Sequence, residues 1–483
     1  MINLILMDKP VSILHISDFH KRTKDKYKNL LASLKTDCNK YVRENGVPKP
    51  NVIIVSGDLV QGGTTEEIKE QYEASLDFLV NLTNDFLNGD KKRVVIVPGN
   101  HDVDWNITKQ SMEVVKPGRK KAEKEAYNEI VKQSHSGDTS SLYRWSWNDQ
   151  KVYMIKDKNK YITRFASFRE FFNKFYDGLY EYPEDEDYQY TFFDVPDLGV
   201  SFLGLNSCYN NDHLNRSGTI NSICVANASS EIERRVQSGQ LVIGVWHHHT
   251  IGTPFEDNYL DYTILDTLVG NGIQLSLHGH QHYCAVAREH TDVYDSRRML
   301  LLSTGSLYGG EHIMSYGASR QYNVITLEER EEKIIISLYS RADMSSRAKD
   351  IPEWGPGLIK GTSSSSWTSE IAAPMDMTEY EEIDSIMRAY ESTGDYIQAL
   401  NRVKLVKAKM PMTRKMILDI MQREEKNEDI ASYFMPPITD DEAIALIDAA
   451  NEINDPELIR KVKELDYIKD SKNPNVINAR NRI

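Results

Sequence analysis

Residues 94–102 spell Val-Val-Ile-Val-Pro-Gly-Asn-His-Asp, a short apolar run followed at once by side chains that can bind a metal ion. The run 94–97 is almost entirely β-branched, which is typical of a buried strand. The polar signature Gly99-Asn100-His101-Asp102 therefore stands at the carboxyl end of a predicted strand. Side chains at that end can meet those that follow neighbouring strands.

The same arrangement occurs four more times in the first two thirds of the chain. A polar signature follows an apolar run at Asp18-Phe19-His20, Gly57-Asp58, His247-His248-His249 and Gly279-His280-Gln281-His282. Each signature alone is a weak indication, because Gly-Asp pairs are common in turns and single histidines often have no function. All five signatures, however, occur in order, and each follows a predicted strand. Together they predict a site for two divalent metal ions.

Short apolar runs also predict the fold class. They lie at residues 11–16, 52–55, 94–97, 202–205, 241–246, 275–277 and 299–302. Their nearly continuous apolar character indicates strands that are covered on both faces, as in a layered α/β protein. Helical patterns at residues 25–43 and 66–87 separate the first three strands, so the chain begins as β-α-β-α-β. Residues 322–327 and 333–341 predict an antiparallel hairpin at a sheet edge.

An insert from about residue 103 to 195 interrupts the series of strands. It begins lysine-rich and becomes aromatic, and Phe168, Phe171, Phe172 and Phe175 keep the spacing of an amphipathic helix. We expect this helix to pack on the sheets rather than to form a platform for stacking bases. Because the insert follows a signature loop, it is placed to wall a substrate cleft.

The composition changes after residue 350. Residues 351–374 are rich in Pro, Gly and Ser, which predicts a linker between a first domain, residues 1–350, and a second, residues 375–483. The second has helical stripes, a capping-box pattern at Thr439 and Glu442, and an N-cap pair at Asp455-Pro456. We expect an α-helical module of helical hairpins that contacts a protein partner or a second copy of the chain.

Composition limits the partners and the compartment. The formal net charge of −14 argues against charge-driven adhesion to nucleic acid or to anionic membranes, although a local basic groove remains possible. The sequence has no run of about 20 apolar residues, no cleavable leader pattern and no close pair among its four cysteines. These features predict a cytoplasmic protein with reduced thiols. A basic stretch directly follows the first signature and consists of Lys21, Arg22, Lys24, Lys26 and Lys28. Its side chains could attract a phosphate substrate or could form the solvated face of a helix, and the sequence favours neither interpretation.

The donor atoms indicate which metals fit. Carboxylate oxygen and imidazole nitrogen suit manganese, iron, zinc or nickel, and the lack of cysteine ligands argues against a closed structural zinc site. Two neighbouring cations need a shared anionic ligand, and the short side chain of Asp58 is suited to bridge them. We expect two divalent ions, with manganese the first candidate.

Together the motifs Asp-x-His, Gly-Asp, Gly-Asn-His-Asp, a histidine after a strand and Gly-His-x-His resemble those of the calcineurin-like metallophosphoesterases. The resemblance covers residues 11–341. It implies a four-layer αββα sandwich of the α/β class and hydrolysis of phosphate esters with two metals. It further implies roles for particular residues. Asp18, His20 and His282 hold one metal, Asp58 bridges, and Asn100, His280 and one histidine of residues 247–249 hold the other. His101 lies beside the scissile phosphate and Asp102 orients its neighbours.

The third histidine motif leaves a choice of ligand. The family shows a histidine pair followed by proline, but here three histidines precede Thr250. His247 is favoured because it comes first after the predicted strand, and His248 is the alternative.

The predicted function is that of a phosphodiesterase of the nuclease type, acting on nucleic acid or nucleotides. A hydroxide that bridges the metals is expected to attack phosphorus, while His101 donates a proton to the leaving oxygen. A phosphomonoesterase or phosphoprotein phosphatase is the alternative, although Gly57-Asp58 continues as Leu59-Val60 rather than with the arginine of the protein phosphatases. A metal-stabilised scaffold without activity is the third hypothesis.

Overall fold

The computed structural model shows two compact units, one within residues 7–374 and one within residues 375–483. It describes residues 10–20, 28–135, 141–250, 259–260, 263–291, 298–309, 319–330, 333–345, 351–374, 377–406, 408 and 410–482. Within these residues, none of the helices is both long and apolar enough to cross a membrane.

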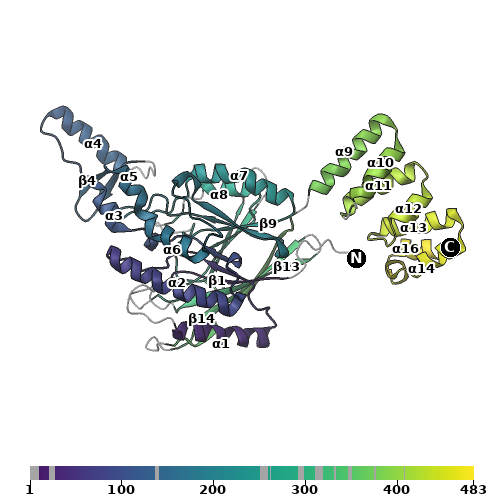
Figure 1. Cartoon of the computed structure of the whole chain (residues 1–483), viewed down its shortest axis with the longest axis horizontal. Helices are drawn as coiled ribbons and strands as arrows, with labels where there is room; N and C mark the ends of the chain where they lie inside the picture. The colour runs from purple at the N-terminus through teal and green to yellow at the C-terminus, as the bar shows by residue number, and fades with distance from the viewer. Residues whose placement is uncertain are drawn as a thin grey trace. The chain divides into compact units, whose positions relative to one another are not determined.

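The first unit holds two large sheets that face each other (Figure 1). One has the strand order β15-β14-β13-β1-β2-β3, with β16 also paired to β14. β1, β2 and β3 are parallel, and β1 is antiparallel to β13. The strands are β1 (Val11–Ile16), β2 (Val52–Val55), β3 (Val94–Ile96), β13 (Gln321–Arg330), β14 (Lys333–Asp343), β15 (Trp354–Pro356) and β16 (Ser366–Ala372).

The second sheet has the order β11-β12-β10-β9-β8-β7, in which β8, β9, β10 and β12 are parallel. Its strands are β7 (Tyr190–Val195), β8 (Val200–Leu205), β9 (Leu241–Val245), β10 (Leu275–His278), β11 (Ala285–Thr291) and β12 (Arg298–Ser303). All seven strands predicted from apolar runs are therefore present.

Helices cover the outer faces of both sheets (Figure 1). In β9, Leu241 and Ile243 belong to the core between the sheets, whereas Val242 belongs to the cluster under the helices on the other face. This alternation explains why the strands are apolar throughout. The covering helices are α1 (Lys28–Asn45), α2 (Thr65–Leu87), α7 (Ser222–Gln237) and α8 (Thr263–Gly270). The predicted four-layer α/β sandwich is confirmed.

The segment predicted as a linker, residues 351–374, is instead part of the first sheet. Lys333 to Tyr339 of β14 pair with β16, and Arg341 to Asp343 pair with β15. The predicted hairpin β13–β14 exists, but its edge position is wrong, because β15 and β16 extend the sheet beyond it. Edge strands that are short and half exposed need little apolar sequence, so their composition resembled that of a linker.

The insert forms a small sheet with the order β4-β6-β5 and several helices. The predicted aromatic helix is α6 (Ala166–Tyr176); its four phenylalanines are buried in the core of the sandwich, which confirms the packing prediction. The other elements are α3 (Trp105–Gln110), β4 (Met112–Val114), α4 (Lys121–His135), β5 (Tyr143–Ser146), β6 (Lys151–Ile155) and α5 (Lys158–Tyr161).

The second unit is helical, as predicted. The Thr439 side chain accepts a hydrogen bond from the Glu442 amide, and Asp455 caps the helix that begins at Pro456. The Glu442 carboxylate does not close the capping box; it accepts two hydrogen bonds, at 2.8 and 2.9 Å, from the Arg414 guanidinium. The helices are α9 (Met377–Thr393), α10 (Tyr396–Val406), α11 (Pro411–Arg423), α12 (Asn427–Tyr433), α13 (Asp440–Ile453), α14 (Pro456–Lys463), α15 (Asp466–Lys469) and α16 (Pro474–Arg480).

Candidate metal centre

The predicted ligands meet where the strands of the two sheets end. The loops after β1, β2 and β3 lie at one edge of the first sheet, and those after β9 and β10 lie at one edge of the second, because these strands are parallel within each sheet. The structure brings together all seven residues predicted as ligands, in two groups that share one carboxylate.

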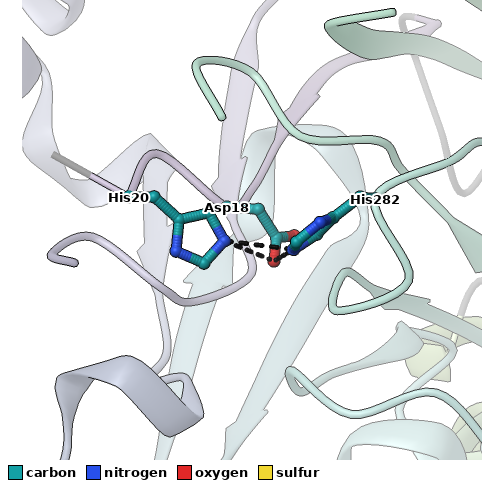
Figure 2. Close-up of side chains that lie close together, drawn as sticks. All are labelled: Asp18, His20 and His282. Atoms are coloured by element: carbon teal, nitrogen blue, oxygen red, sulfur yellow. Dashed lines mark hydrogen bonds and ion pairs between the residues drawn. The ribbon is translucent and has the colours of Figure 1, made fainter. Parts of the chain in front are cut away.

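The first group consists of Asp18, His20 and His282 (Figure 2). The His282 Nε2 atom lies 3.1 Å from Asp18 Oδ1 and 3.0 Å from His20 Nε2. The His20 Nε2 atom lies 3.7 Å from the same Asp18 oxygen. Three possible ligand atoms, one from each residue, thus face a common point.

The second group consists of Asn100, His247 and His280. The Asn100 Oδ1 atom lies 3.1 Å from His247 Nε2 and 3.0 Å from His280 Nδ1, and the two nitrogens are 3.3 Å apart. Asp58 connects the groups, since its Oδ2 lies 3.3 Å from His247 Nε2 and 3.8 Å from His20 Nε2.

The donor atoms fit divalent ions. Ligands that share an ion at about 2.0–2.2 Å lie roughly 3 to 3.6 Å from each other by simple geometry, close to the separations within each group. Asp18 Oδ1 is buried and has no hydrogen-bond partner among the described residues. A cation would satisfy that oxygen and the facing imidazole nitrogens together.

The structure places His247 and His248 differently. The His247 Nδ1 atom lies 2.7 Å from the Ser56 carbonyl oxygen, and since a carbonyl only accepts, this nitrogen donates and Nε2 faces Asn100 and Asp58. The His248 Nδ1 atom instead lies 2.9 Å from Ser207 Oγ. The geometry therefore favours His247 as the ligand.

The backbone at these ligands is unusual. Asp18, His20, Asp58, His280 and His282 have φ angles of 54°, 44°, 56°, 73° and 57°, in the left-handed region that non-glycine residues seldom adopt. Each such residue costs of the order of 1 kcal/mol or more and persists where the surrounding structure enforces it. Strain gathered at five facing side chains is typical of a functional site.

Electrostatics keep the two carboxylates ionised. Burial acts to raise the pKa of Asp18 and Asp58, but the facing histidines, His282 at Asp18 and His247 at Asp58, outweigh it and lower both pKa values. Burial also lowers the pKa of His280 to about 3, so its imidazole stays neutral and keeps a lone pair. Ionised carboxylates and a neutral imidazole are the forms that bind metal.

His101 lies beside the first group and, although it is not one of the predicted ligands, one of its ring nitrogens lies within 4.8 Å of possible ligand atoms of His20 and Asp58. Its Nδ1 atom lies 2.9 Å from the Gln61 carbonyl oxygen and must donate to it, so that Nε2 is the ring nitrogen left for another partner. Its ring centroid is 4.7 Å from that of His20, and its amide donates to Asp58 Oδ1 at 2.8 Å. This arrangement holds an imidazole next to the shared carboxylate.

Asp102 is a buried anchor for the loops that carry the ligands. Its Oδ2 accepts hydrogen bonds from the amides of Asp58, Gly99 and Leu59 at 2.9, 2.8 and 3.4 Å, and its Oδ1 accepts from the Tyr72 hydroxyl at 2.9 Å. Burial, followed by the charge of Asp58, raises the pKa of Asp102 to about 7. Asp102 is thus a positioning residue, and the insert supports it through Phe171 of α6, whose ring stacks on Tyr72 at 5.1 Å.

An Asp102→Ala variant is expected to lose about 3 kcal/mol of unfolding free energy, because three buried amides would lose their acceptor. Its metal affinity is expected to fall by about tenfold to a hundredfold. Urea unfolding and metal titration measure these changes. Asp102→Asn keeps one acceptor oxygen and is the matched control, which should retain most of the stability; an Ala variant as stable as the parent would contradict the anchoring role.

Acid is expected to destabilise the fold by protonating buried histidines that are not among the predicted metal ligands. Burial lowers the pKa of His15 to about 3 and that of His249 to about 4. The unfolded chain binds more protons than the folded one below about pH 6.5, so unfolding free energy falls as pH falls, by about 1.4 kcal/mol per pH unit for each histidine. Urea unfolding at pH 7, 6 and 5 measures the slope, which His15→Gln should reduce. Equal stability at pH 7 and 5 would contradict this.

Sequence reasoning missed Ser207. Its hydroxyl accepts hydrogen bonds from the amides of His247 and His248, both at 3.1 Å, and so fixes the histidine loop. Asn206 and Ser207 directly follow β8, so the rule of a polar residue after an apolar run would have identified them. The basic stretch predicted for phosphate steering, from Lys21 to Lys26, lies outside the described residues.

Comparison with known proteins identifies the family. A family model described as calcineurin-like phosphoesterase matches residues 11–284, which is more than half of the chain. No curated protein matches the chain significantly.

Three solved structures are similar at low identity. A dimetal phosphatase from Danio rerio is 11% identical and covers 68% of this chain and 95% of its own, with a TM-score of 0.33. YfkN, a calcineurin-like phosphoesterase from Bacillus subtilis, is 11% identical over 82% of this chain and 96% of its own, with a TM-score of 0.25. Vps29 from Chaetomium thermophilum is 10% identical over 76% and 96%, with a TM-score of 0.24. At TM-scores this low, the similarity to these structures carries no conclusion about the function of this chain. On the family match, the chain belongs to the calcineurin-like phosphoesterases and is a metal-dependent phosphoester hydrolase.

Proposed function

We propose that this protein is a phosphodiesterase that acts on nucleic acid or nucleotides with two divalent metal ions, manganese being the first candidate. The observation that carries the proposal is the position of Asp58 Oδ2, which lies between two groups of ligand atoms. A shared carboxylate would allow two cations to lie close together, and two-metal sites of this kind stabilise the attacking and leaving oxygens of an in-line displacement at phosphorus.

In this proposal each residue has one task. Asp18, His20 and His282 hold one ion, Asp58 bridges, and Asn100, His247 and His280 hold the other. The bound ions would supply an activated water and neutralise charge on the phosphate oxygens. His101 keeps its Nδ1 proton on the Gln61 carbonyl and delivers a proton from Nε2 to the leaving oxygen.

The charge of the centre favours a diester over a monoester. Within the described part of the chain, the ion pairs of Asp18 and Asp58 are formed with histidines alone. The residues after Asp58, Leu59 and Val60, are apolar and buried. Among the described residues, no lysine or arginine therefore pairs with these two carboxylates, which suits the single charge of a diester better than the charge of about −1.5 to −2 on a monoester at neutral pH.

A substrate panel with manganese tests the proposal. Linear DNA, RNA, cyclic nucleotides, an aryl diester and an aryl monoester are each compared with the Asp58→Asn variant, and magnesium, zinc and nickel replace manganese in parallel. Cleavage of nucleic acid or nucleotide diesters is the expected result. Turnover confined to monoesters would overturn it.

We also propose that the second unit serves protein contact or self-association. Its helix α10 exposes Ile397 by 71% and Leu405 by 81%, two large apolar side chains that lie on one face. Light scattering across a concentration series tests self-association, and Leu405→Asp is expected to abolish any dimer observed.

A further inference from the structure

The insert differs in charge from the rest of the protein. Residues 105–165, called the arm below, contain 13 Lys and Arg against 7 Asp and Glu, a formal charge of +6 in a chain of −14. The arm comprises α3, β4, α4, β5, β6, α5 and the turn after it, and α4 lies at the left end of Figure 1. Positive charge is therefore concentrated in the segment that follows, in the sequence, the loop that carries Asn100 and His101.

Much of this charge is available for a ligand. Lys116, Arg119, Lys120 and Lys124 are exposed, and none forms an ion pair with a described residue. The nearby Glu123 carboxylate forms no ion pair with these side chains; it accepts hydrogen bonds from the backbone amides of Arg119 and Lys120 at 2.9 and 3.1 Å. A cluster of unpaired cations on a compact element attracts phosphate groups.

The arm also exposes an indole. Trp147, in the turn between β5 and β6, is 74% exposed and meets Trp145 edge to face at 6.0 Å. The partner indole limits the orientations of Trp147, so the exposed face needs little further ordering to receive a flat ligand. Aromatic rings beside cations are the recurring elements of surfaces that bind single strands, because bases stack on the rings while phosphates contact the cations.

The same combination occurs at the metal centre. The Trp105 ring lies 6.2 Å from the His101 ring, centroid to centroid, and the exposed Arg216 places its guanidinium 5.1 Å over Trp105. An aromatic ring and a cation therefore occur together both on the arm and beside the metal centre.

A buried carboxylate fixes the arm to the loop that carries Arg216. Asp212 accepts hydrogen bonds from Arg144 Nε at 2.8 Å and the Tyr161 hydroxyl at 2.9 Å, both on the arm. It also accepts from the amides of Leu214 and Asn215 in the loop, at 2.8 and 2.9 Å. These contacts fix the position of the arm relative to the loop that carries Arg216.

We propose that the arm binds single-stranded nucleic acid and leads it past Trp105 and Arg216 to the metal centre; this rests on the proposed function. A single strand is favoured over a duplex because unpaired bases can stack on Trp147. The phosphates would contact the cluster of Lys116, Arg119, Lys120 and Lys124.

Binding is measured by fluorescence anisotropy with labelled 20-nucleotide strands of thymidine and of uridine, on an Asp58→Asn background so that the strands stay intact. Trp147→Ala is expected to weaken binding about fivefold to a hundredfold. Reversal of three arm charges is expected to weaken it at least tenfold and to lower the salt dependence by about 0.7 for each lost phosphate contact. The arm variant combines Lys116→Glu, Arg119→Glu and Lys120→Glu, and the matched control combines Lys40→Glu, Lys49→Glu and Lys92→Glu, exposed positions outside the arm.

Three results would each overturn the proposal. The first is unchanged affinity in both arm variants, the second is an equal loss of affinity in the arm and control triples, and the third is tighter binding of a duplex than of a single strand. Turnover of a small aryl diester, measured with the arm variants in the otherwise unaltered chain, separates this result from the proposed function. That turnover is expected to stay within twofold of the parent. Absence of turnover in the parent would defeat the proposed function, whereas normal turnover in the parent together with strand binding that the arm substitutions leave unchanged would defeat the arm proposal alone.

Discussion

An Asp58→Asn variant is expected to lose at least a hundredfold of the turnover of any phosphoester substrate, a lower limit taken from the effect of changing residues that merely support a metal ligand. Asp58 Oδ2 lies within 3.8 Å of histidines from both groups, so the amide would remove the one negative charge that the two ions share. Turnover of an aryl diester with manganese measures the effect.

The fold is expected to survive this change. The substituted amide side chain would retain an oxygen able to accept the His101 amide, a hydrogen bond that Asp58 Oδ1 accepts at 2.8 Å in the structure. Circular dichroism and the urea midpoint of the metal-free variant are the controls. A folded variant with turnover within tenfold of the parent would show that Asp58 does not bridge two ions.

A His101→Ala variant is expected to distinguish substrates by their leaving group. Proton donation by a positioned side chain contributes about a hundredfold to ten-thousandfold, so turnover of a dinucleotide, whose leaving oxygen must be protonated, should fall by that factor. Turnover of a 4-nitrophenyl diester, whose leaving group is stable as an anion, should fall less than tenfold. The ratio of the two rates in one variant is therefore the measurement.

The comparison of substrates provides its own control. A structural defect or loss of metal would lower both rates together, whereas loss of a proton donor lowers only one. Equal losses on the two substrates would contradict the role of His101 as proton donor.

The sequence identified the residues that meet at this site because their positions depend on local pattern. Asp18, Asp58 and His280 each follow shortly after an apolar strand, and the parallel order of the strands within each sheet brings such positions to one edge. Their left-handed backbone is not visible in the sequence, since none of the three is glycine.

Contacts between segments that are distant in the sequence could not be predicted from local patterns. The choice of His247 over His248 depends on the Ser56 carbonyl, 191 residues away, and Tyr72 reaches Asp102 across 30 residues. Asp212, which joins the arm to its loop, follows no apolar strand and carries no motif. The strands β15 and β16 are stabilised by pairing with β14 rather than by apolar composition.

The number of manganese ions bound per chain tests the central claim most directly. Elemental analysis after equilibrium dialysis is predicted to find two ions per chain in the parent and at most one in His247→Ala, which removes a ligand from the second group alone. One ion or none in the parent, or two ions retained in His247→Ala, would contradict a dinuclear centre built from these residues.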